Sequence, residues 1–88
     1  MDAMTVRWSE YEYYDVNEDA NVVQFQAITP LGTWCVDVIP ESSRSYRRYK
    51  QAFQETITQL MVDGHKLYED INLAERILET MEHSHTVH

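Results

Sequence analysis

Apolar positions in the second half of the chain recur at helical spacing. Between residues 42 and 63 they fall three and four residues apart, at Tyr46, Tyr49, Phe53, Ile57 and Leu60. This spacing places the five side chains on one face of an α-helix. Ser42 or Ser43 is suited to cap its start, and Gly64 is suited to stop it. We therefore predict a long helix over about residues 42–63.

A second, shorter helical pattern follows near the C-terminus. Asn72 and Glu75 have the spacing of a capping box, with Asn in place of the usual Ser or Thr. Apolar positions and acidic positions then fall on opposite sides, with Leu73, Ile77, Leu78 and Met81 against Glu75, Glu79 and Glu82. The pattern predicts a helix over about 72–83, followed by a frayed tail at 84–88. Residues 65–68 are expected to form a loop or a fourth edge strand.

The first half of the chain has the alternating pattern of strands. Residues 5–14, 22–28 and 33–39 are rich in aromatic and β-branched side chains. The turn sequence Thr29-Pro30-Leu31-Gly32 joins the second and third of these as a hairpin. Pro40 ends the third, because proline has no N–H to donate to a sheet. The sequence thus predicts an α+β fold, a three-stranded antiparallel sheet followed by two helices, in a single domain of residues 1–88.

Two helices cannot cover both faces of the predicted sheet. We expect the apolar stripe of the long helix to lie on one face and the shorter helix to cover the edge of that core. The other face then keeps several large apolar groups exposed, and its candidate interface residues are Trp8, Tyr11, Tyr13, Val22, Ile28, Cys35 and Ile39. Large exposed apolar patches are uncommon in monomers, so we predict a protein partner, most simply a second copy in a homodimer. Alternatively, Gln24, Gln26 and Asp37 keep this face solvated.

Composition is that of an ordinary small globular domain. The chain has 88 residues, of which 43% are apolar and 25% charged, with a single cysteine, Cys35. One cysteine allows no internal disulfide and favours a reducing compartment. The first residues lack the basic and apolar regions of a signal peptide, and no apolar run approaches the length of a membrane span. The expected location is the cytoplasm.

Charge is distributed unevenly along the chain. The net charge is −8, yet residues 42–50 hold four bases and no acid. These bases, Arg44, Arg47, Arg48 and Lys50, occupy the first turns of the long helix, where the helix dipole disfavours cations. They are candidates for binding an anion such as a phosphate, and the alternative is that they pair with acids of the same chain. The rest of the surface is acidic enough to repel nucleic acid, so direct nucleic-acid binding is not expected.

Other candidate sites favour ordinary structure. Residues 15–21 place oxygen side chains at alternate positions, as in the first half of an EF-hand loop. Ala20 and Gln26 stand where that loop needs Gly and Glu, so a hairpin turn is favoured. His83, His85 and His88 lack fixed geometry for a metal, and Cys35 lacks a neighbouring base that would make it a nucleophile. No metal, cofactor or catalytic group is predicted, and we do not expect an enzyme.

These patterns favour a small acidic protein-binding module. It would act by docking on a basic surface of a target protein, for example as an inhibitor. The alternative is a binding module for a small anionic ligand, such as a nucleotide or another phosphorylated molecule, at residues 44–50. The sequence resembles no family that would decide between them.

Overall fold

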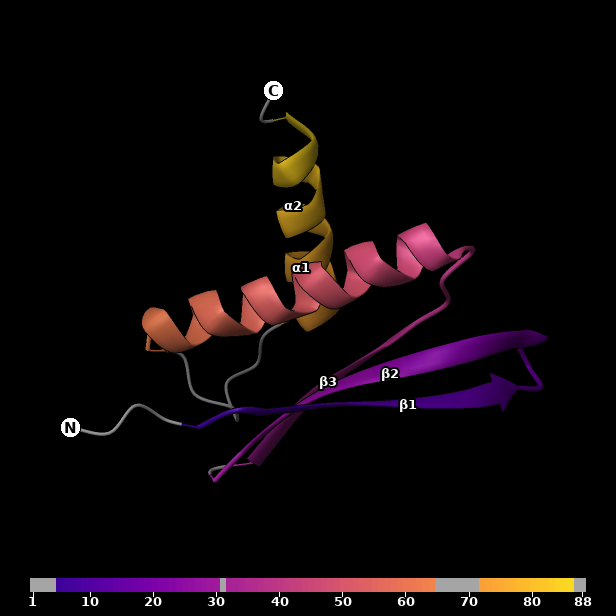
Figure 1. Cartoon of the computed structure of the whole chain (residues 1–88), viewed down its shortest axis with the longest axis horizontal. Coiled ribbons are helices and arrows are strands. Elements are labelled where there is room, and N and C mark those ends of the chain that lie inside the picture. Colours follow the sequence, from indigo (N-terminus) through magenta and orange to yellow (C-terminus); the bar gives the residue numbers. More distant parts are fainter. Residues whose placement is uncertain (1–4, 31, 65–71, 87–88) are drawn as a thin grey trace. The chain divides into compact units, whose positions relative to one another are not determined.

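The computed structural model describes residues 5–30, 32–64 and 72–86, with side chains to residue 82 (Figure 1). The chain forms two compact units, Met1–Ile39 and Pro40–His88. The first holds the strands β1 (Arg7–Asp15), β2 (Ala20–Thr29) and β3 (Gly32–Val38). The second holds the helices α1 (Ser43–Val62) and α2 (Leu73–Thr86). The predicted α+β class and the order of its elements are confirmed, whereas the single domain stays a prediction.

The three strands form one antiparallel sheet in the order β1-β2-β3. β1 pairs with β2 at all nine of its positions, from Arg7 opposite Ile28 to Asp15 opposite Ala20. β3 pairs with β2 from Gly32 opposite Thr29 to Val38 opposite Val23. At the second turn Gly32 has a φ of 140°, a backbone conformation that favours glycine. The predicted hairpin is therefore confirmed, while Leu31 within its turn lies outside the described residues.

The strand register sorts the side chains onto two faces of the sheet. Because neighbours across antiparallel strands share a face, Phe25 lies beside Val36 and Ala27 beside Trp34. The side chains of Val23, Phe25, Ala27 and Trp34 are all buried, so we call this side the buried face. The opposite side carries Tyr11 and Tyr13 of β1, Val22, Gln24, Gln26 and Ile28 of β2, and Cys35 and Asp37 of β3. We call it the tyrosine face.

A reciprocal pair of serines fixes the start of α1. The hydroxyl of Ser42 accepts from the backbone N–H of Ser45 at 3.1 Å, and the hydroxyl of Ser45 accepts from the N–H of Ser42 at 2.9 Å. This is a capping box with Ser at its third helical position, and it confirms Ser42 as the N-cap. After Asp63, Gly64 adopts a φ of 82° and ends the helix as predicted.

The two helices pack against each other within their unit. Asn72 caps α2, since its side-chain oxygen accepts from the N–H of Glu75 at 3.1 Å. The hydroxyls of Thr56 and Thr80 lie 3.0 Å apart and join the two helices. Figure 1 shows α2 crossing α1 steeply rather than running alongside it. Phe53, Ile57 and Leu60 of α1 and Ile77 of α2 are buried, as their spacing predicts. Ala52, outside the predicted stripe, is also buried, whereas Tyr46 and Tyr49 of that stripe are half-buried.

The structure corrects the predicted end of the second helix and does not describe the segment that precedes it. The backbone of α2 runs to Thr86, past the predicted end at residue 83. The loop or edge strand predicted at 65–68 lies outside the described residues.

In the part of the chain that the structure describes, neither helix combines the length and the apolar character that crossing a lipid bilayer requires.

Candidate functional site

The tyrosine face presents ordered aromatic side chains to solvent. Tyr11 is 60% exposed, and its ring stacks on that of Tyr13 with centroids 5.8 Å apart and planes 22° apart. The two residues are neighbours on this face because they stand two positions apart in β1. The two rings therefore contact each other without a partner. Exposed tyrosines of this kind supply large contact areas at a low loss of side-chain entropy.

A chain of polar side chains crosses the middle of this face. The amide of Gln26 donates to the side-chain oxygen of Gln24 at 2.7 Å, and the amide of Gln24 donates to Asp37 at 3.0 Å. We call Gln26, Gln24 and Asp37 the polar ladder. It follows from the register, which places Gln24 opposite both Tyr11 and Asp37. The ladder makes the face amphipathic, with aromatic contact area beside a fixed carboxylate.

Tyr13 is linked electrostatically to the ladder. Partial loss of water raises the pKa of its hydroxyl above the ordinary tyrosine value, and the negative charges of Asp37 and Asp15 raise it further. A hydrogen bond between this hydroxyl and the carboxylate of Asp37 adds to the rise in pKa. Val22, which lies opposite Tyr13, is buried.

The turn between β1 and β2 ends the sheet in a cluster of acids. One carboxylate oxygen of Asp15 accepts from the backbone N–H groups of Asn17 and Glu18, at 2.9 and 3.3 Å. Asp19 has a positive φ of 49°, and it accepts a hydrogen bond from the hydroxyl of Tyr14, which raises the pKa of that tyrosine. These bonds confirm the predicted hairpin turn. No group of three potential metal ligands occurs among the described residues.

The strand register places the predicted interface residues on both faces of the sheet and not on one. Tyr11, Tyr13, Val22, Ile28 and Cys35 all share the tyrosine face, and Ile39, just after β3, is 44% exposed. Trp8 lies on the other side, beside Ala27 on the buried face, and is 38% exposed. Its place follows from strand alternation, since Trp8 and Tyr11 have opposite parity in one strand.

The basic cluster lies on the first turns of α1. Arg44, Arg47 and Arg48 are exposed and form no ion pair with another described residue. Lys50 is partly buried, with its ammonium 6.0 Å from the centre of the Tyr46 ring. The pairing with the chain's own acids that we weighed from the sequence is thus not seen for the three arginines within the described residues. Their guanidinium groups are accessible to an anion.

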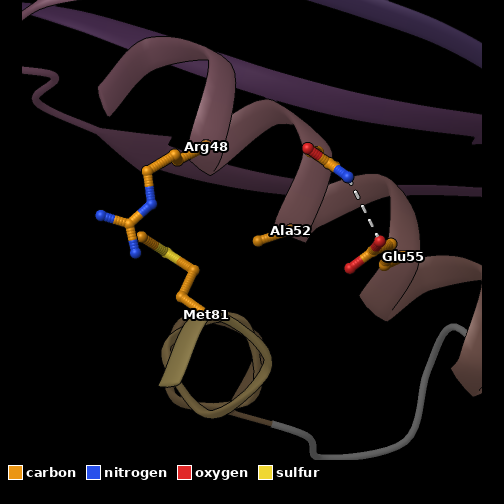
Figure 2. Close-up of a pocket in the computed structure, with 5 residues that line it drawn as sticks. Arg48, Ala52, Glu55 and Met81 are labelled. Atoms are coloured by element: carbon orange, nitrogen blue, oxygen red, sulfur yellow. Dashed lines mark hydrogen bonds between the residues drawn. The ribbon is translucent and has the colours of Figure 1, made fainter. Parts of the chain in front are cut away.

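A hollow of about 150 Å³ lies beside this cluster on the helical pair. It is lined by Arg48, Gln51, Ala52 and Glu55 of α1 and by Met81 of α2. Figure 2 shows the side chain of Arg48 reaching from α1 toward Met81, while the amide of Gln51 donates to Glu55 at 3.5 Å. The hollow could not be predicted from residue patterns, because it depends on where α2 crosses α1.

Comparison with known proteins supplies no further information on the site. No protein-family model, no curated protein and no solved structure matches this chain.

Proposed function

We propose that this chain is a small acidic protein-binding module, and that its tyrosine face docks on a basic surface of a target protein. The observation that carries the proposal is the stacked pair of the exposed Tyr11 and the half-buried Tyr13, beside the carboxylate of Asp37. Tyrosines are enriched where proteins bind each other, and a partly exposed carboxylate favours a partner that brings a cation.

The negative charge of the sheet indicates which kind of partner its tyrosine face can bind. Residues 5–39, which contain the sheet, hold six acids and one base. Two such surfaces placed face to face would repel each other, so a second copy is a poor occupant of this face. A target with Lys and Arg around an apolar contact complements it. A protein that covers a functional basic surface in this way would act as an inhibitor.

The test first captures binding proteins with this chain and then measures their affinity with purified proteins. Proteins captured from cells of the source organism are purified, and their binding to wild type and variants is measured by calorimetry. Tyr11→Ser should weaken binding by about 2 kcal/mol or more, the size of an interface hot spot. Tyr14→Ser is the matched control, because Tyr14 lies in the same strand on the other face and is 54% exposed.

Three results would count against the proposal. One is a captured protein that binds wild type and Tyr11→Ser equally well. Another is binding that Tyr14→Ser weakens as strongly as Tyr11→Ser. The third is binding that does not weaken as salt rises, since contacts between an acidic face and a basic target are screened by salt.

A second candidate function is anion binding at the start of α1. It is favoured by the accessible guanidinium groups of Arg44, Arg47 and Arg48. One backbone donor there is already used, because the N–H of Ser45 bonds to Ser42. A thermal-shift series with inorganic phosphate, pyrophosphate and ATP tests this function. Stabilisation that disappears in the double variant Arg47→Ala, Arg48→Ala would support it, and no shift with any of the three would contradict it.

A further inference from the structure

The two outer strands of the sheet differ in how their edges are protected. β1 and β3 each have a strand on one side only within the described residues. Proteins commonly prevent such edges from pairing with another chain by placing charged side chains along them. β1 carries four charges in nine residues, at Arg7, Glu10, Glu12 and Asp15. β3 carries one in seven, at Asp37. β3 is therefore the less protected edge.

From this difference we infer that β3 pairs edge to edge with β3 of a second copy. The two strands would run antiparallel about a two-fold axis perpendicular to the sheet and would make one sheet of six strands. This inference goes beyond the proposed docking on a target, because it concerns the edge of the sheet and not its tyrosine face.

The sequence of β3 is compatible with itself in this arrangement. When all seven residues overlap, Cys35 lies opposite Cys35 of the second copy. Trp34 then faces Val36 of the other strand, which is an aromatic and β-branched pair of the kind that stabilises sheets. Asp37 faces Thr33, whose hydroxyl can donate to the carboxylate oxygen that Gln24 does not use. No two like charges lie opposite each other.

The same arrangement is less favourable for β1. Full overlap of two β1 strands places Glu10 opposite Glu12 of the second copy, twice in the dimer, and directly opposed like charges destabilise a sheet. Arg7 lies opposite Asp15, also twice, but these attractive pairs stand at the ends of the strand. The charges of the two edges thus favour β3 as the strand that pairs and β1 as the strand that stays at the outside. The two tyrosine faces would lie on the same side of the joined sheet and form one continuous surface.

Charge variants of exposed residues test the edge and its register. The dissociation constant of the reduced protein is measured by light scattering and sedimentation, with Cys35→Ser as the reference. Cys35→Lys places two ammonium groups opposite each other and should weaken the dimer about tenfold or more. Thr33→Lys places a cation opposite Asp37 and should tighten it. Ser9→Lys makes the same change on β1, in the same face, and should leave the constant unchanged.

Cross-linking gives an independent measure of register. With diamide as the oxidant, two Cys35 thiols each lose a proton and an electron to form one disulfide, which can only be intermolecular because the chain has a single cysteine. In the matched variant Thr33→Cys, in a Cys35→Ser background, the thiol is likewise at an exposed position. Its two thiols would lie four residues apart along the strand, about 13 Å. Wild type should therefore cross-link in larger yield than this variant at the same concentration.

Clear results would overturn the inference. A monomer at millimolar concentration would do so, and so would a dimer weakened by Ser9→Lys and not by Cys35→Lys. Equal cross-linking of wild type and Thr33→Cys would show random collision and not a paired edge. None of these measurements involves a target protein, so failure here and failure of target binding are separate outcomes.

Discussion

Reversing the charge of Arg44 should make the protein more stable. Arg44 stands at the second position of α1, two residues after the N-cap Ser42, and no acid occupies the first turn of this helix. The positive end of the helix dipole favours a carboxylate at this position and disfavours a guanidinium. Arg44 is exposed and has no ion pair among the described residues, so replacing it removes no favourable contact there.

The size of the effect follows from two local terms. Removing a cation from the first turn and adding an anion are each worth about 0.3–1 kcal/mol, toward the lower end for an exposed side chain. Arg44 and Arg48 are four residues apart, so Arg44→Glu also converts a repulsive pair into an attractive one, a change of about 0.4–1 kcal/mol. Together they predict about 1–2 kcal/mol of added stability, which corresponds to a rise in Tm of roughly 5–10 °C for a chain of this size.

The measurement is the free energy of unfolding in urea, with thermal melts for comparison. Arg44→Gln should show about half of the gain, because it removes the cation without adding the anion. Both gains should shrink in high salt, since the helix terminus is exposed to solvent. A loss of stability in Arg44→Glu would refute this reasoning. It would show that Arg44 pairs with an acid of its own chain, which is the alternative to an anion site.

Three further predictions concern other parts of the fold. Ser42→Ala removes one half of the capping box and should lower the free energy of unfolding in urea by about 0.5–2 kcal/mol. Ile57→Ala should lower it by about 2–5 kcal/mol because Ile57 is fully buried, whereas Val62→Ala, at a position 74% exposed, should change it by less than about 0.5 kcal/mol. The pKa of Tyr14 is higher in the folded state than the ordinary value of about 10 that it has in the unfolded state. The hydrogen bond of Tyr14 therefore contributes fully to stability below about pH 10, and this contribution is lost as the pH rises through the folded-state pKa. Tyr14→Phe should therefore lose less stability than wild type above pH 10, and equal losses in the two proteins would contradict the bond to Asp19.

Much of the fold could be predicted because local signals agreed with one another. Helical spacing from Tyr46 to Leu60, a serine before it and Gly64 after it all indicated the same helix, and the structure places its ends within one residue of the prediction. The turn at Pro30 and Gly32 likewise fixed the second hairpin. That the apolar stripe of α1 packs on the sheet stays a prediction.

Which residues form the candidate site depends on how the strands pair, and sequence patterns alone do not determine that pairing. Both parities of the first strand contain aromatics, so alternation alone did not show that Trp8 and Tyr11 belong to opposite faces. The polar ladder also requires the register, since Gln24 and Asp37 are thirteen residues apart. Ser45 was missed as a capping residue because the usual pattern has Glu or Gln there.

The polar ladder bears on the choice of partner for the tyrosine face. Gln24 uses its oxygen to accept from Gln26 and one N–H of its amide to donate to Asp37, so part of the hydrogen-bonding capacity of these amides is already used. The carboxylate of Asp37 keeps lone pairs that can accept further hydrogen bonds. Burying the charge of Asp37 against an apolar partner would leave it without a countercharge, which is strongly unfavourable. A partner that supplies an Arg or Lys to Asp37 while an apolar group packs on the two rings complements both the charge and the aromatic area of this face, and a purely apolar or acidic partner does not.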